Sequence, residues 1–192
     1  MGAALERTAR FGLQVAPASP AGRGPYLTDA RLPEIFPVLR EALGKPVSTD
    51  ALVGQCLQVT WDFLPAVERW LGCQAFFTIG WVDLGHSRQW DQFDDAFIST
   101  MLTRGHGGGP VKVHAWLTLD SLEILDVTLM TSLAVTLGTE GKGEVLAGDP
   151  NDTGQVVLKP MLVGPDFVFK TGMAKLFSRG DDRLVAKMAI DE

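Results

Sequence analysis

The sequence has few of the residues that mark several common classes of protein. Among its 192 residues there are only two cysteines and three histidines. Two cysteines are too few for the disulfide framework of a small secreted domain, and three widely spread histidines give no zinc-binding spacing. A run of about 18 apolar residues, which a membrane-spanning helix needs, is also missing. We therefore expect no disulfide framework, no bound metal and no membrane partner.

Signals for targeting and for nucleic-acid binding are missing as well. Glu6 and Arg7 interrupt the N-terminal segment before the apolar core of a secretory signal forms. The cytoplasm is therefore the default compartment, with signal-independent secretion left open. The chain carries 17 basic and 23 acidic residues, a formal net charge of −6, without a cluster of Lys and Arg. Binding to phosphate groups needs such a cluster, so a nucleic-acid partner is not expected.

Two polar stretches resemble binding motifs only superficially. The glycine-rich stretch at residues 105–110 lacks the Lys-Ser/Thr ending of a phosphate-binding loop, so we expect no nucleotide cofactor there. Asp149, Asn151 and Asp152 do not have the spacing of an EF-hand and are interpreted as a solvated turn. No metal or organic cofactor is implied.

The composition that is present favours one folded domain. The chain is 46% hydrophobic and 21% charged, which is too apolar for intrinsic disorder. A chain of this length buries about 70% of the surface that its unfolded form exposes. Residues 1–31 are rich in Pro and Gly between positions 16 and 25 and are expected to be an irregular N-terminal segment. Residues 32–192 are expected to form a single domain.

Hydrophobic periodicity along this domain predicts an α+β fold. Helices come first, and strands joined mostly as hairpins follow, which is not the alternating order of a parallel sheet. Helices are expected at residues 32–43, 55–71, 91–103, 131–137 and 181–189, and strands at residues 74–82, 111–119, 122–128, 155–163 and 166–170. Pro65 lies inside the second helix and is expected to kink it or to begin a second segment. A long polar loop is expected at residues 138–154.

Three residues on these elements form a candidate catalytic triad. Cys56 begins a predicted helix, whereas His114 and Asp126 lie on consecutive predicted strands. A thiol is a weak nucleophile until it ionises, and a helix N-terminus stabilises the thiolate through its partial positive charge. An imidazole can hold the thiol proton, and a carboxylate can fix the orientation of the imidazole. The chain therefore supplies the three parts of a cysteine nucleophile system.

The length of the turn between the two strands decides whether His114 and Asp126 meet. A two-residue turn at positions 120–121 would place His114 opposite Val127, with Asp126 on the other face of the sheet. An odd-length loop would instead place His114 opposite Asp126, with their Cβ atoms about 5 Å apart. The triad therefore predicts an odd-length loop. Trp116 and Ile124 would then share the face of the two triad residues and help to exclude water.

These motifs resemble those of a known family. Gly-Gln-Cys at a helix start, His-Ala-Trp on a strand and Leu-Asp-x-Thr on the next strand are similar to the transglutaminase-like branch of the papain-like cysteine enzymes. The resemblance covers residues 52–129 and keeps the order Cys, His, Asp of that family. It implies a papain-like core, in which the helix that carries the cysteine packs on an antiparallel sheet. It also implies that Cys56 is the nucleophile, His114 the general base and acid, and Asp126 the orienting carboxylate.

The sequence departs from that family in the residue after the cysteine and in having no upstream residue that can be assigned as the second oxyanion donor. Eukaryotic-type transglutaminases have Trp after the cysteine, where this chain has Leu57. The backbone amide of Cys56 supplies one oxyanion donor, and the side chains of Gln55 and Trp116 are the candidates for substrate contact or a second donor. Peptide hydrolysis, glutamine deamidation and transfer of the acyl group to an amine all stay open. Hydrolysis of a peptide or glutamine amide is favoured, because water needs no second substrate pocket.

Other interpretations of these residues compete with this triad. His86 is the competing base, His106 is interpreted as part of a mobile loop or a lid, and Cys73 as a core residue. The alternative function is a non-catalytic protein-binding module on a transglutaminase-like fold with a vestigial site. In a third interpretation residues 1–50 cover the cleft. The expected partner is a peptide or protein substrate, and the sequence does not indicate an oligomeric state.

Overall fold

The structure is a computed structural model that describes residues 1–14, 25–44, 48–85, 88–110, 112–138 and 140–176. Helices and strands follow one another along the chain as α1 (Gly2–Arg10), η1 (Leu32–Glu34), α2 (Ile35–Leu43), η2 (Thr49–Leu52), α3 (Cys56–Leu71), β1 (Ala75–Asp83), β2 (Gln89–Trp90), α4 (Asp95–Arg104), β3 (His114–Leu119), β4 (Ile124–Asp126), α5 (Leu129–Leu137), β5 (Leu146–Gly148), β6 (Val157–Val163), α6 (Asp166–Lys170) and η3 (Met173–Leu176).

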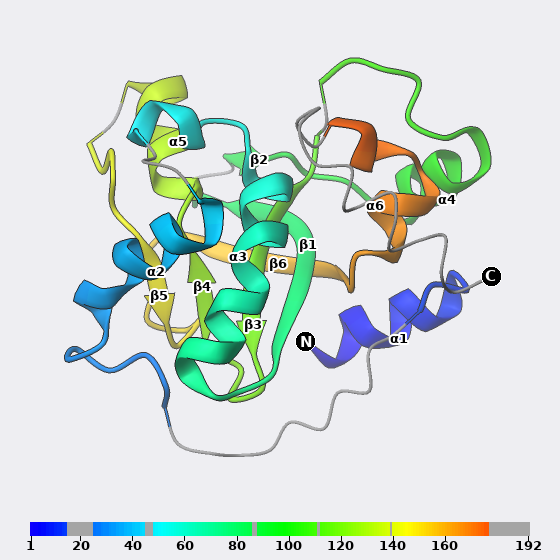
Figure 1. Ribbon diagram of the computed structural model, residues 1–192. Coiled ribbons are helices and arrows are strands. Elements are labelled where there is room, and N and C mark those ends of the chain that lie inside the picture. The colour runs from blue at the N-terminus through cyan, green and yellow to red at the C-terminus, as the bar shows by residue number, and fades with distance from the viewer. Residues whose placement is uncertain (15–24, 45–47, 86–87, 111, 139, 177–192) are drawn as a thin grey trace.

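The strands form one antiparallel sheet. Its order is β2-β1-β3-β4-β5, and β6 pairs with β1 as well. Strand β1 lies at the centre, because β2 and β3 pair with it in succession and β6 runs along its length (Figure 1). All five pairings are antiparallel. The predicted α+β class is confirmed.

Helix α3 packs across one face of this sheet, against β1 and β3 (Figure 1). Its apolar residues recur at helical spacing and meet alternate residues of the two strands. These contacts form the main core, with α3 contributing Leu57, Val59, Phe63, Ala66, Val67 and Leu71, and the strands contributing Ala75, Phe77, Ile79, Ala115, Leu117 and Leu119. The Thr60 hydroxyl donates to the Ala115 carbonyl at 3.2 Å, and this hydrogen bond links α3 directly to the backbone of β3.

Helix α3 has the bounds that its sequence predicts. It ends at Gly72, which adopts a left-handed φ of 64° that a glycine tolerates best. The helix continues through Pro65 as a single element, so this proline does not begin a second segment.

On β3 and β4, the side chains that alternate with the residues of the main core pack against α5. Trp116 and Ile124 lie in one cluster with Leu129 and Leu133. Gly80 on the neighbouring strand makes room for this cluster, since a Cβ atom there would lie 2.6 Å from the Trp116 ring and 2.1 Å from the Lys159 carbonyl oxygen. Helices therefore contact both faces of the sheet.

The loop between β3 and β4 has three residues, which confirms the predicted odd length. Leu117 pairs with Leu125 and Thr118 with Ile124, and the Leu119 amide donates to the Glu123 carbonyl at 2.8 Å, so residues 120–122 form the loop between the last paired residues. Leu122 ends the loop with φ 73°, the left-handed conformation typical of three-residue hairpin loops. The register is two residues away from the predicted one. His114 and Asp126 are therefore diagonal neighbours on one face of the sheet instead of direct partners.

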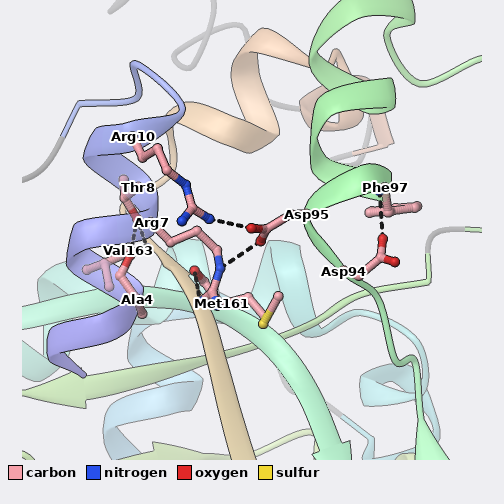
Figure 2. Close-up of polar contacts among 9 residues, drawn as sticks. All are labelled: Ala4, Arg7, Thr8, Arg10, Asp94, Asp95, Phe97, Met161 and Val163. Carbon is pink, nitrogen blue, oxygen red and sulfur yellow. Dashed lines mark hydrogen bonds and ion pairs between the residues drawn. The ribbon is translucent and has the colours of Figure 1, made fainter.

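The expectation that residues 1–31 are irregular is wrong at the N-terminus, where α1 forms. One side of this helix buries Ala4 and Thr8 against β6, and the Thr8 hydroxyl accepts the Val163 amide at 2.9 Å. Arg7 and Arg10 pair with Asp95 at the start of α4 (Figure 2). This helix is stabilised by contacts with distant residues, which local periodicity does not reveal.

Three further expectations need correction. Residues 166–170 form helix α6 and not a strand, because Pro165 suits a helix start and Phe167 and Val168 are buried as neighbours without alternating. The expected loop at residues 138–154 contains β5. Helix α4 begins at Asp95 instead of Asp91, with the Asp94 carboxylate accepting the Phe97 amide at 2.9 Å as its cap (Figure 2). The expected helix at residues 181–189 lies outside the described residues.

No helix in the described part of the chain combines the length and apolar character needed to cross a bilayer.

Candidate active site

Cys56 is the first residue of α3. The tight turn before it uses Gly54 at φ 68°, and the Gly54 amide donates to the Ser132 hydroxyl at 3.3 Å. This contact ties the start of α3 to α5. The first amides of a helix have no carbonyl partner within it, so the backbone N–H of Cys56 is available to a ligand. The half-buried thiol lies 3.7 Å from the Val113 carbonyl oxygen, beside the start of β3.

His114 begins β3 and is 3% exposed. Its Nε2 atom forms a short hydrogen bond with Oδ2 of Asp126. The Cys56 sulfur lines the same cavity as this ring and raises its pKa. Because Nε2 is occupied by Asp126, Nδ1 is the nitrogen left for the thiol. Trp116 stacks on the imidazole, with 6.0 Å between ring centroids and 23° between ring planes.

Asp126 is held by the start of the next helix. Its Oδ1 atom accepts hydrogen bonds from the Thr128 amide at 2.9 Å, the Thr128 hydroxyl at 3.0 Å and the Leu129 amide at 3.0 Å. The carboxylate thus caps α5, while Oδ2 faces His114. Both oxygens have partners, so the carboxylate is fixed in the orientation that the imidazole needs.

These contacts shift the ionisation of both groups toward an ion pair. Burial alone lowers the pKa of His114, but the charge and hydrogen bond of Asp126 and the Cys56 sulfur raise it above its usual value. Burial alone raises the pKa of Asp126, but His114 and the amides of Thr128 and Leu129 lower it below its usual value. Both shifts favour the charged forms, an imidazolium beside a carboxylate.

The Cys56–His114 pair opens onto a cavity of about 430 Å³. Its lining comes from the start of α3, from β2, from the segment before β3 and from α5: Val53, Gly54, Gln55, Cys56, Leu57, Gln58, Trp90, Asp91, Pro110, Val113, His114, Ser132 and Thr136. Gln55, predicted as an oxyanion or substrate contact, is exposed in this wall. Asp126 lies behind His114, outside the lining.

Trp116, the other predicted oxyanion or substrate contact, does not line the cavity. It is 1% exposed and packs behind the imidazole with Ile124 and α5. Its position suits the predicted role in excluding water and does not suit contact with a substrate. The physical reason is the alternation of the strand, since residues 114 and 116 share a face and the ring of Trp116 fills the space next to Gly80.

Sequence reasoning missed a wall of the cavity that includes Trp90 and Asp91. Trp90 pairs with Val82 at the end of the short strand β2, and Asp91 follows it with a left-handed φ of 54°. The sequence places Asp91 at the start of the expected helix at residues 91–103, whereas the structure begins that helix at Asp95 and leaves Asp91 in the segment before it. A residue other than glycine at positive φ is uncommon and often lies at a functional site, but this conformation is visible only in the structure.

The remaining candidates lie elsewhere. Cys73 is half-buried beyond the opposite end of α3, where burial and then Asp120, Glu68 and Glu123 raise its pKa to about 11. His106 is not a lining residue, and its amide donates to the Thr171 carbonyl at 2.6 Å. His86 lies outside the described residues. No described residue of the segment 1–50 lines the cavity.

The polar stretch that resembles a calcium motif forms a turn. The Asp149 carboxylate accepts both the backbone and the side-chain amide of Asn151 at 2.8 Å. Over the described ranges, no three His, Cys, Asp or Glu side chains are grouped in a way that could hold a metal ion.

Comparisons with known proteins leave these residues to be judged on their geometry and chemistry: no family model, no curated protein and no solved structure matches the chain.

Proposed function

We propose that the chain is a cysteine-dependent amide hydrolase or acyl transferase with a transglutaminase-like, papain-like core. The observation that carries the proposal is the placement of His114 between the Cys56 thiol and a carboxylate that is locked by a helix start. The substrate is a peptide bond or the side-chain amide of a glutamine. Both have the carbonyl carbon that a thiolate attacks.

In the first half of the reaction, the Cys56 sulfur attacks the amide carbonyl carbon. The carbonyl oxygen becomes an oxyanion, which the backbone N–H of Cys56 stabilises, and the exposed side-chain amide of Gln55 is the candidate second donor. The His114 imidazolium then gives its Nδ1 proton to the amide nitrogen. The C–N bond breaks, an amine leaves, and a thioester joins the acyl group to Cys56.

In the second half, the neutral imidazole of His114 takes a proton from a water molecule as its oxygen attacks the thioester. The C–S bond breaks, a carboxylic acid leaves, and the sulfur and the imidazolium return to their starting states. An amine in place of water would give a new amide. Asp126 keeps the ring in one orientation through both halves, because its own carboxylate is fixed by the amides of Thr128 and Leu129.

Alkylation of the two cysteines tests this proposal. The chain would be treated with iodoacetamide at pH 6.5, and the modification of each cysteine would be followed by peptide mass spectrometry. We expect Cys56 to react at least tenfold faster than free N-acetylcysteine in the same buffer, because a thiolate paired with an imidazolium persists at that pH. Cys56→Ala should leave no fast-reacting site, and Cys73→Ala should leave the fast reaction unchanged.

A second measurement separates an enzyme from a binding module with a vestigial site. A mixture of unmodified peptides that include glutamine would be incubated with the chain, and released ammonia, new termini and acylated Cys56 would be measured. An enzyme gives at least one of these products, and Cys56→Ala abolishes it. Slow alkylation of Cys56, like that of a free thiol, together with no product would contradict the proposed function.

A further inference from the structure

The cavity carries one charge that the proposed reaction does not use. Asp91 is half-buried in the wall beside Trp90, and both residues line the same cavity as Cys56 and His114. The backbone of Asp91 holds the left-handed φ of 54°, which is uncommon for a residue with a side chain. The fold therefore keeps a carboxylate in this wall at some conformational cost.

The carboxylate of Asp91 gives the cavity a negative charge without an ion-pair partner among the described residues of the lining. Apart from the Cys56 and His114 of the proposed reaction, Asp91 is the only ionisable residue among the described residues that line the cavity. Within the described ranges, its carboxylate forms no ion pair. Burial raises the pKa of Asp91, and the charges of His114 and Lys112 lower it by a smaller amount. A cation in the cavity would restore the balance.

Trp90 adds a second feature that favours a cation. Trp90 is a half-buried lining residue that precedes Asp91 in the chain and also packs against the cluster of Val82 and Trp116. The face of an indole attracts ammonium and guanidinium groups. An aromatic ring beside a carboxylate is a good receptor for such a group, because the ring supplies apolar contact and the carboxylate supplies charge. The rest of the wall is neutral and includes Val53, Leu57, Pro110 and Val113.

We propose that Asp91 and Trp90 form a subsite for a positively charged side chain of the substrate, so that the amide attacked by Cys56 lies close to a lysine or arginine. This inference rests on the proposed function, because only an enzyme has a substrate. The charge selectivity of the cavity does not depend on catalysis and can be measured by itself.

Methanethiosulfonate reagents of different charge measure this selectivity at Cys56. The thiolate attacks the sulfur of the reagent, a mixed disulfide forms, and methanesulfinate leaves. We would compare a trimethylammonium-ethyl, a sulfonato-ethyl and a neutral methyl reagent in a Cys73→Ser background at 0.15 M salt. Each rate is divided by that of the neutral reagent, which cancels changes in the nucleophilicity of Cys56. Salt at this concentration screens charges more than about 8 Å from the site.

We expect the cationic reagent to react faster than the anionic one, and Asp91→Asn to lower the ratio of the two rates by about fivefold to tenfold. Asn tolerates left-handed φ, and Asp91→Gly provides a second variant that removes the charge without backbone strain. Asp29→Asn is the matched control, since Asp29 is exposed and not a lining residue. It should leave the ratio within about twofold.

An unchanged ratio in both Asp91 variants would overturn the inference and leave the proposed function standing. A slow reaction of Cys56 with the neutral reagent, with a ratio that still depends on Asp91, would contradict the proposed function and keep the charge-selective subsite.

Protection of Cys56 identifies the source of the cation. The probes are N-acetyl-lysine methylamide, its uncharged norleucine analogue and butylamine, each added before the neutral reagent. Slower modification with the lysine compound alone, lost in Asp91→Asn, supports a basic side chain of a peptide. Protection by butylamine alone would overturn this assignment in favour of a free amine.

Discussion

Helix α3 has a half-buried cysteine near each end, and the two thiols differ in their neighbours. Cys56 begins the helix, beside the helix start and the imidazole of His114, and both residues line the cavity. Cys73 lies two residues beyond the last residue of the helix, where carbonyl groups point outward and Asp120, Glu68 and Glu123 surround it. One helix therefore offers a matched pair of thiols in opposite electrostatic surroundings.

Position, and not residue type, decides the surroundings of each cysteine. A cavity lies in front of Cys56, whereas Cys73 packs beside the hydrophobic core formed by α2, α3 and the sheet. The same contrast holds for the nearby carboxylates. Asp126 has hydrogen-bond partners on both oxygens, while the buried Oδ1 of Asp120 has no partner among the described residues. The four predictions below change one end of α3 and use the other end as a control.

The largest effect is expected when Asp126 is removed. Asp126→Ala should lower the free energy of unfolding by about 3–5 kcal/mol, because it leaves a buried imidazolium unpaired and the amides at the start of α5 without an acceptor. Urea unfolding followed by circular dichroism measures this change. Asp120→Ala at the other end should cost about 1 kcal/mol, since the hydrogen bond that its Oδ2 atom accepts from the Gln74 backbone amide is long, at 3.4 Å. Equal costs at the two ends would contradict the prediction.

The next effect concerns the reactivity of Cys56. His114→Gln should slow the alkylation of Cys56 by iodoacetamide at pH 6.5 about 100-fold, because glutamine can neither take the thiol proton nor carry a positive charge. Alkylation of Cys73 in the same sample should not change, which makes it an internal control for folding and reagent. A Cys56 rate that stays within about threefold would show that the helix start alone activates the thiol.

Much of this site could be predicted from the sequence, because local signals determine its parts. Helical spacing with Gly72 as a stop predicts α3, and the need to place His114 and Asp126 on one face predicts an odd-length loop. The register differs by two residues because the loop takes Leu122 as its third residue, at φ 73°. Nothing in the sequence indicates that a leucine adopts this conformation in preference to its neighbours.

The parts that could not be predicted depend on contacts between distant residues. Helix α1 is stabilised by β6 and by the pairing of Arg7 and Arg10 with Asp95, about 85 positions along the chain (Figure 2). Trp90 and Asp91 line the cavity because β2 pairs with the end of β1. A strand of two residues is too short to have a recognisable sequence pattern. Trp116 was expected near the substrate, but its ring packs behind the imidazole because Gly80 leaves space for it there.

The pH dependence of stability gives the third prediction. His114 has a raised pKa in the folded chain, so the folded state binds more protons than the unfolded state above the ordinary histidine pKa of about 6.5. The contribution of His114 to stability is complete below that pH and is lost progressively as the pH rises toward the folded pKa. Urea unfolding at pH 6.5 and at pH 8 should therefore show a lower free energy of unfolding at pH 8. His114→Gln should remove most of this difference, whereas Cys73→Ala should keep it.

The smallest effect is expected at Cys73. Burial is the largest cause of its raised pKa, and Asp120 is the largest contribution from a charge, so removing that charge lowers the pKa only in part. Asp120→Asn should increase the rate of Cys73 alkylation at pH 9 about threefold and leave the rate of Cys56 unchanged. Asp29→Asn removes an equal charge at an exposed position and should change neither rate. If Asp120→Asn leaves Cys73 unchanged, burial alone protects this thiol, and the electrostatic half of the contrast between the two helix ends belongs to Cys56 only.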